Sequence, residues 1–141
     1  MIHSYKVSCE RDNLRLIREF VGVVLKSIAL SEIEINQLIL AVDEVCSNLI
    51  IHSQQCNPEK SIEIHIHHQP DSILFELMDY NSEHFDLSNY QKPNIHQLVK
   101  ERRKGGFGLM LVNNIMDHVE VAYEKKCSTW RMYKYLKPQK S

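Results

Sequence analysis

Three polar residues recur at intervals of four toward the end of a segment with helical periodicity. Glu44, Asn48 and His52 stand at i, i+4 and i+8. In a helix such a row advances by about 40° per step and follows the border of the apolar stripe, so its side chains are half-buried and can reach a cleft. A carboxamide oxygen can ligate a hard cation such as Mg²⁺, and a carboxylate one turn away can accept a proton. The alternative is a solvated helix flank, because such pairs are common on amphipathic helices.

Glycine is concentrated at one place in the chain. Gly105, Gly106 and Gly108 are three of only four glycines, and they precede a run with helical periodicity. A Rossmann fingerprint is excluded because no third glycine follows at its spacing, and a Walker A loop is excluded because no Gly-Lys-Ser/Thr occurs. Two interpretations remain. The cluster is either a flexible hinge or a phosphate cradle at a helix N-terminus. Residues 102–104 (RRK) add positive charge beside it, unless they are only a solvated basic run.

Hydrophobic periodicity predicts the elements that carry these residues. Residues 3–9 are a short strand candidate. A helix is expected from Asp12, which is a candidate N-cap, and a second helix from Ser31, where Glu34 completes a capping-box signature.

Two hairpins and a third helix follow. The strand candidates SIEIHIHHQ (61–69) and SILFELMDY (72–80) are separated by the turn signal Pro70–Asp71. The third helix is expected over 107–118. The last hairpin is expected from HVEVAYEKKC and STWRMYKYL.

The polar residues 81–105 contain Pro93 and show no convincing periodicity, which favours a lid or binding loop. The predicted order is therefore β–α–α–β–β–(lid)–α–β–β. This order indicates an α+β fold: a two-layer α/β sandwich with a mixed, mostly antiparallel sheet covered by three helices.

Composition places limits on the class of protein. The 141 residues suit a single domain, 1–141. The net charge of −1 gives no support for nucleic-acid binding, and no apolar run reaches the roughly 18 residues of a membrane span. The N-terminus has no signal-peptide pattern. We therefore expect a cytoplasmic protein whose four cysteines are reduced thiols: Cys9, Cys46, Cys56 and Cys127.

Histidines gather in the strand candidate 61–69. His65 and His67 would share one face of this strand, so they could supply two metal ligands. No cysteine or carboxylate is clearly placed to complete a metal site. The pattern therefore favours side chains on the outer face of a sheet.

Three motifs, in order, resemble those of a known family. EVCSNLIIH (44–52) resembles the N-box of the gyrase, chaperone and histidine-kinase-like ATPases, ELMDYN (76–81) their first glycine box, and GGFGL (105–109) their second. The pattern E-x-x-x-N-x-x-x-H and the length are most similar to the anti-sigma-factor serine/threonine kinases of bacterial partner-switching systems. The resemblance covers nearly the whole chain and implies a Bergerat ATP-binding fold.

The resemblance also implies roles. Glu44 would take the proton from a serine or threonine hydroxyl of an antagonist protein, and Asn48 would hold Mg²⁺. Asp79 would bind the adenine amino group, and Lys104 the terminal phosphate of ATP. The implied nucleotide-binding set is Asn48, His52, Asp79, Asn81, Lys104, Gly105, Gly106, Phe107, Gly108 and Leu109. The family is cytoplasmic and usually dimeric, and its members also sequester a sigma factor or another effector.

The chain departs from the family pattern in the motif that the resemblance assigns to binding the adenine base. The D-x-G box is here Asp79-Tyr80-Asn81, and the spacing from Asp79 to Phe85-Asp86 is one residue longer than expected. Asparagine tolerates a left-handed backbone better than most residues. These changes bear on nucleotide affinity more than on chemistry. Two alternatives therefore stay open: a regulatory module of the same fold that binds nucleotide weakly or not at all, and a detached histidine-kinase catalytic domain.

Overall fold

The computed structural model describes residues 2–51, 59–79, 106–124 and 127–136, without the side chains of 51, 106–109 and 123–124. Its elements follow the predicted order. They are β1 (Ile2–Ser8), α1 (Asn13–Lys26), α2 (Glu32–Ile51), β2 (Ser61–Gln69), β3 (Ser72–Asp79), α4 (Gly106–Ile115), β4 (His118–Glu124) and β5 (Cys127–Tyr135). The proposed lid, 81–105, lies outside the described residues.

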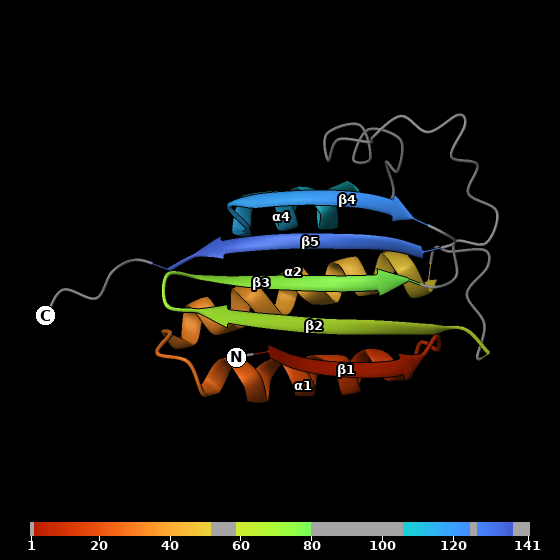
Figure 1. Ribbon diagram of the computed structural model, residues 1–141, viewed down its shortest axis with the longest axis horizontal. Coiled ribbons are helices and arrows are strands. Elements are labelled where there is room, and N and C mark those ends of the chain that lie inside the picture. The colour runs from red at the N-terminus through yellow and green to blue at the C-terminus, as the bar shows by residue number, and fades with distance from the viewer. Residues whose placement is uncertain (1, 52–58, 80–105, 125–126, 137–141) are drawn as a thin grey trace, which may run out of the picture.

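The strands form one sheet in the order β1-β2-β3-β5-β4, and every described pairing is antiparallel (Figure 1). The β2–β3 hairpin closes with Gln69 opposite Ser72. Its two-residue turn is the predicted Pro70–Asp71. The second hairpin joins β4 to β5 and places β5 beside β3 in the middle of the sheet.

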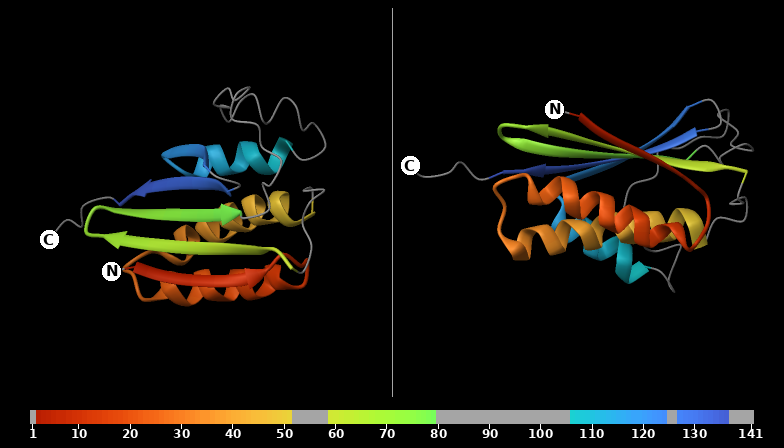
Figure 2. Two further views of the ribbon diagram at one scale, coloured as in Figure 1. Left: turned by 45° about the vertical axis from the view of Figure 1, so that its right-hand side comes forward. Right: turned by 90° about the horizontal axis from the view of Figure 1, so that it is seen from below.

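The three helices of the described residues, α1, α2 and α4, lie on one face of the sheet, as Figure 2 shows in its view from below. Alternation in the strands explains this arrangement, since every second side chain points toward the helices. Ile62, Ile64 and Ile66 of β2 are fully buried, as are Ile73, Phe75 and Leu77 of β3. Burying each of these side chains contributes about 1.5–3 kcal/mol. The predicted two-layer α+β sandwich is confirmed.

Helix α1 begins where predicted, but its N-cap differs from the expectation. Asp12 makes no side-chain cap hydrogen bond, and its φ of −63° and ψ of −21° are already helical. A capping side chain needs a non-helical backbone at its own position. The N–H groups of Asn13 and Leu14 instead donate to the carbonyls of Glu10 and Arg11.

Helix α2 begins with the predicted capping box. The backbone N–H of Glu34 donates to Ser31 Oγ at 3.1 Å, and the N–H of Ser31 donates to Glu34 Oε1 at 3.3 Å. The 20-residue helix packs against α1 on one side and α4 on the other. It is therefore the central helix of its layer.

Helix α4 ends at Ile115, three residues before the predicted end. The chain is already held by β5 at this point, because the N–H of Asp117 donates to the carbonyl of Tyr133 at 2.9 Å. Lys134 Nζ donates to the carbonyl of Ile115 at 3.0 Å and so binds the last turn. These contacts come from a distant strand, so local periodicity did not reveal them.

The cysteines are only partly as predicted. Cys46 and Cys127 are not in disulfides, as expected, whereas Cys9 is disulfide-bonded. The spacing of cysteines along the sequence does not reveal which sulfur atoms meet in the fold. Separately, no helix among the described residues has the length and apolar character to span a membrane.

Candidate functional site

One line along α2 faces away from the core. Its exposed and half-buried members follow the helical period, and we call them the outer line of α2: Ile33, Asn36, Gln37, Leu40, Asp43, Glu44 and Ser47. Glu44 lies on this line. Asn48 lies beside it on the buried flank and is only 7% exposed. The expected row is therefore present for its first two members, but only Glu44 is half-buried as expected, since Asn48 is buried. His52 lies outside the described residues.

The carboxamide of Asn48 is held by its own helix. Its Nδ2 donates to the backbone carbonyl of Glu44 at 3.0 Å. This contact accounts for an asparagine in the middle of a helix, where such a residue is otherwise unfavourable. With the nitrogen engaged by the backbone, Oδ1 is the atom of this carboxamide that could ligate a cation.

The two acidic residues at this point of α2 differ in their partners. Asp43 Oδ1 accepts a hydrogen bond from Arg18 Nη1 of α1 at 3.0 Å, which ties the two helices together. The half-buried carboxylate of Glu44 makes no hydrogen bond or ion pair within the described residues. Of this pair, Glu44 is therefore the one whose oxygen atoms could accept a proton from an incoming group.

Two buried polar residues meet at the end of β3. Asp79 is the last residue of β3 and lies opposite Ser128 of β5. They are 4% and 3% exposed, whereas the other buried residues of the described strands are apolar. The sequence-based prediction included Asp79 but missed Ser128. The alternation through Trp130 and Met132 places Ser128 on the inward face, and a serine at an inward position was the available signal.

The predicted phosphate cradle coincides with the start of α4. Gly106, Phe107, Gly108 and Leu109 form its first turn, where backbone N–H groups have no partner inside the helix. Val112 and Ile115 are buried behind that turn, and α4 packs against α2. Lys104 and Gly105 lie outside the described residues.

These segments gather toward one end of the molecule. The C-terminal half of α2, the end of β3 and the start of β5 share that end, and α4 begins facing it (Figures 1 and 2). The structure thus brings the C-terminal half of α2, the end of β3 and the first turn of α4 to the same end of the molecule. Asn81, the altered member of the first glycine box, lies outside the described residues.

A thiol near the site is excluded from nucleophilic chemistry. Cys46 is fully buried two residues before Asn48. Burial raises its pKa far above the ordinary thiol value, and the nearby negative charge of Asp43 raises the pKa further. The thiol therefore stays protonated, and a protonated thiol is a poor nucleophile.

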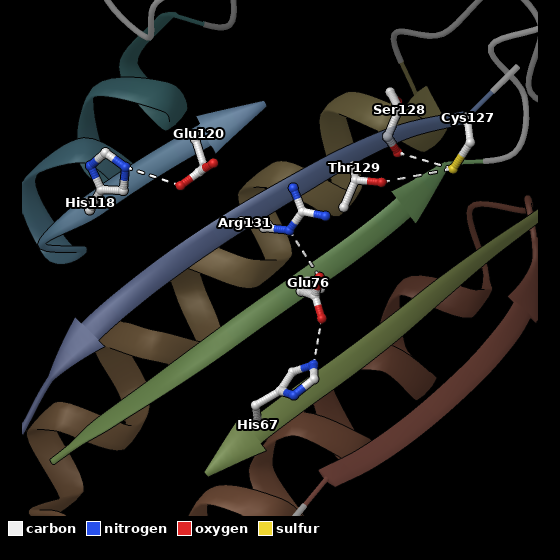
Figure 3. A network of polar contacts seen from close by, with 8 residues as sticks. All are labelled: His67, Glu76, His118, Glu120, Cys127, Ser128, Thr129 and Arg131. Atoms are coloured by element: carbon white, nitrogen blue, oxygen red, sulfur yellow. Dashed lines mark hydrogen bonds and ion pairs between the residues drawn. The ribbon is translucent and has the colours of Figure 1, made fainter. Parts of the chain in front are cut away.

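A second polar cluster lies on the opposite face of the sheet (Figure 3). Glu76 of β3 is bonded by both His67 Nε2 and Arg131 Nε, the latter at 3.0 Å. His65 Nε2 is 2.7 Å from Glu63 Oε1. His65 and His67 therefore lie on the outer face, as expected, and each is paired with a carboxylate. His68 lies opposite the buried Ile73, so the alternation of the strand places it on the other face. Within the described ranges no group of three histidine, cysteine, aspartate or glutamate residues is placed to hold a metal ion.

The fold and the site together define a class of protein. A two-layer sandwich with a Glu-x-x-x-Asn helix, a buried Asp at a strand end and a glycine-rich helix start is the arrangement of a nucleotide-binding ATPase domain. Residues 7–134 match the family described as histidine kinase-like ATPase domain, and the chain belongs to this family.

Two curated relatives are similar to this chain over most of its length. The chain is 27% identical over 124 residues to the "Anti-sigma F factor" of Halalkalibacterium halodurans, covering 86% of this chain and 83% of the relative. It is 30% identical over 114 residues to the "Serine-protein kinase RsbW" of Oceanobacillus iheyensis, covering 73% and 72%. The resemblance to anti-sigma-factor kinases noted in the motifs is therefore confirmed.

Two solved structures share the fold. One holds the RsbU and RsbW domains of Rv1364c from Mycobacterium tuberculosis, with a TM-score of 0.68 and 12% identity over 98% of this chain and 33% of that longer chain. The other is the SiaB-SiaC complex from Pseudomonas aeruginosa, with a TM-score of 0.62 and 10% identity over 95% of this chain and 89% of that chain. At these identities the likeness concerns the fold alone.

Proposed function

We propose that the protein is an ATP-dependent serine/threonine kinase of the anti-sigma-factor type, which phosphorylates an antagonist protein in a partner-switching system. Family membership and the names of the two curated relatives support the coarser part of this proposal. The finer part depends on one observation. Glu44 and Asn48 lie one turn apart on α2. The Glu44 carboxylate makes no hydrogen bond or ion pair to another described residue, and the amide nitrogen of Asn48 donates to the helix backbone.

Phosphoryl transfer requires positioning and charge neutralisation more than covalent chemistry from the protein. In the proposed reaction, the hydroxyl oxygen of the acceptor serine or threonine bonds to the terminal phosphorus of ATP. The Glu44 carboxylate accepts the proton of that hydroxyl, and ADP leaves. The first-turn N–H groups of α4, from Gly106 to Leu109, stabilise negative charge on the phosphate oxygens. Lys104, Gly105 and His52 lie outside the described residues; in this proposal Lys104 and Gly105 would extend the cradle, and His52 would be near the phosphates.

Mg²⁺ fits the donor set at Asn48. This ion commonly takes only one or two protein ligands and completes its shell with phosphate oxygens and water. A single carboxamide oxygen on α2, without a surrounding group of carboxylates in the described residues, agrees with such a site. When bound, the ion would neutralise phosphate charge. The protein's part is to hold the Asn48 carboxamide in place.

Asp79 and Ser128 form the base end of the proposed nucleotide site. A buried carboxylate can accept from the amino group of adenine, and a neighbouring hydroxyl can both donate and accept. Asn81 follows two residues after Asp79, and the segment 81–105 would be the lid over the nucleotide. We further propose a cytoplasmic homodimer that also sequesters a sigma factor or another effector.

One experiment tests the chemistry. The protein is incubated with radiolabelled ATP and the antagonist protein encoded by a neighbouring gene, and Glu44→Gln is compared with wild type. We expect transfer to fall at least a hundredfold while ATP stays bound, since a general base contributes about 10²–10⁴-fold. Glu32→Gln is the matched control, because it makes the same change at an exposed glutamate of α2. Retained transfer in Glu44→Gln would remove Glu44 from the mechanism.

Because the first glycine box is Asp79-Tyr80-Asn81 instead of D-x-G, one alternative function stays open: a regulatory module that binds nucleotide weakly or not at all. Isothermal titration of the wild type with Mg·ATP decides this, since such a module would give little or no heat. The remaining alternative, a detached histidine-kinase catalytic domain, is decided by acid treatment of the phosphorylated product. A phosphoserine persists in acid, whereas a phosphohistidine hydrolyses.

A further inference from the structure

Large apolar side chains are exposed on the helical layer and not only on the sheet. Among the described residues, four of the six exposed large apolar side chains are on helices: Val23, Ile33, Leu40 and Met110. Ile33 is 71% exposed and Leu40 is 41% exposed. Both belong to the outer line of α2, the line that also carries Glu44. Leu40 is one turn before Glu44, and Ile33 is two further turns away.

We infer that this outer line is the docking track for the protein acceptor, and that Leu40 and Ile33 contact apolar side chains flanking its serine or threonine. The inference rests on the proposed function, because Glu44 must reach the acceptor hydroxyl. Any segment that brings a hydroxyl to Glu44 has to lie over the neighbouring surface of α2. Two exposed apolar residues on that surface would be buried by such a segment, which favours binding.

The spacing on the helix predicts a pattern in the acceptor. Leu40 lies about 6 Å and Ile33 about 16 Å along the helix axis from Glu44, at a rise of 1.5 Å per residue. An extended segment covers about 3.3 Å per residue. We therefore expect apolar residues about two and about five positions from the phosphorylated residue, on the same side.

A groove beside the outer line has room for one of these side chains. It runs between α1 and α2 with a volume of about 700 Å³, and its walls include Val23, Ile35 and Ile39. Asn36 belongs both to this wall and to the outer line. The groove is thus continuous with the surface that leads to Glu44.

The test measures kcat and KM for the antagonist protein with wild type, Leu40→Gln and Ile33→Gln. Glutamine is a good helix former, so both variants should fold. We expect KM to rise about threefold to tenfold in each, as the loss of partial burial of one apolar side chain predicts. The value of kcat and the Kd for Mg·ATP should stay at the wild-type level, because both variants keep Glu44 and the residues of the proposed nucleotide site unchanged.

Two further variants control the result. Leu40→Met keeps an apolar side chain and should retain the wild-type KM. Ile2→Gln removes a 62% exposed isoleucine from β1, on the other layer of the molecule, and should leave KM unchanged. Sedimentation of each variant shows whether its state of association has changed.

The outcomes separate the two proposals. An unchanged KM in both Leu40→Gln and Ile33→Gln, with wild-type transfer intact, would overturn the docking inference alone. A changed sedimentation coefficient with an unchanged KM would also overturn it, by assigning the surface to self-association. Absence of transfer by the wild-type protein would overturn the proposed function and the docking inference with it.

Discussion

The side-chain amide nitrogen of Asn48 donates to the backbone carbonyl of Glu44 at 3.0 Å. A residue proposed to hold the metal is therefore oriented by the residue proposed to accept the proton. Because the contact uses backbone atoms of Glu44, its carboxylate stays available. One helical turn thus carries both of the residues to which these roles are proposed.

Asn48→Ala should weaken Mg·ATP binding at least tenfold, because it removes the proposed cation ligand; tenfold corresponds to about 1.4 kcal/mol. The cost to folding should be smaller. The lost hydrogen bond contributes about 1 kcal/mol, and alanine partly offsets this through its higher helix propensity. Isothermal titration and urea unfolding measure the two effects. Asn36→Ala, an exposed position on the same helix, should leave Mg·ATP affinity unchanged.

Asp79→Asn should lower ATP affinity by at least tenfold, since the proposed acceptor for the adenine amino group loses its charge. Ser128→Ala should lower it less, because a neutral hydrogen bond contributes about 1 kcal/mol. The ratio of the affinities for ATP and GTP, measured by competition, is a more specific test than ATP affinity alone. Guanine presents a carbonyl where adenine presents an amino group. We expect Asp79→Asn to lose discrimination between the two nucleotides. If Asp79→Asn and wild type discriminate equally between ATP and GTP, adenine does not bind at Asp79.

The control for Asp79→Asn and Ser128→Ala is Asp71→Asn in the β2–β3 turn, at the opposite end of β3. The side chain of Asp71 is exposed and makes no hydrogen bond or ion pair within the described residues. The same chemical change there should leave both nucleotide affinities at the wild-type level.

Much of the fold was predictable because the signals are local. The capping box of Ser31 and Glu34 and the Pro70–Asp71 turn each depend on residues within a few positions of one another. The predicted Glu44–Asn48 row was also local, since the helical period alone places the two residues side by side.

The features that were missed depend on distant contacts. Helix α4 ends early because β5 holds Asp117, and the sequence around Ile115 carries no sign of this. Ser128 becomes notable only when the sheet places it opposite Asp79. The disulfide at Cys9 likewise depends on which sulfur atoms meet in space.

The outer face of the sheet provides a test of stability that is separate from function. Glu76→Gln weakens two charge-assisted contacts, to His67 and Arg131, and the Glu76 side chain is only 17% exposed. We expect the free energy of unfolding to fall by about 1.5–3 kcal/mol, the range for hydrogen bonds to charged groups. Mg·ATP affinity should not change, because this network lies on the face opposite the helices.

Glu120→Gln is the comparison for Glu76→Gln. Glu120 pairs with His118 at 3.2 Å, and the His118 side chain is 56% exposed. Exposed pairs contribute only about 0–1 kcal/mol, so urea unfolding should barely detect this variant. If both variants lower the free energy of unfolding by the same amount, the Glu76 network with His67 and Arg131 stabilises the fold no more than an exposed ion pair does.

Cys46 links pH to stability in a direction that can be worked out. Burial raises the pKa of its thiol in the folded state above the ordinary value of 9.0. Above that pH the unfolded chain releases the thiol proton while the folded chain keeps it, so stability falls as pH rises, by about 1.4 kcal/mol per pH unit for one group. Unfolding in urea between pH 8 and pH 10 should show this decline in wild type. The slope should be reduced in Cys46→Ala and retained in Cys127→Ala, whose thiol is only half-buried. An identical slope in Cys46→Ala and wild type would mean that the decline comes from other groups, such as Tyr133, whose pKa is also raised by burial.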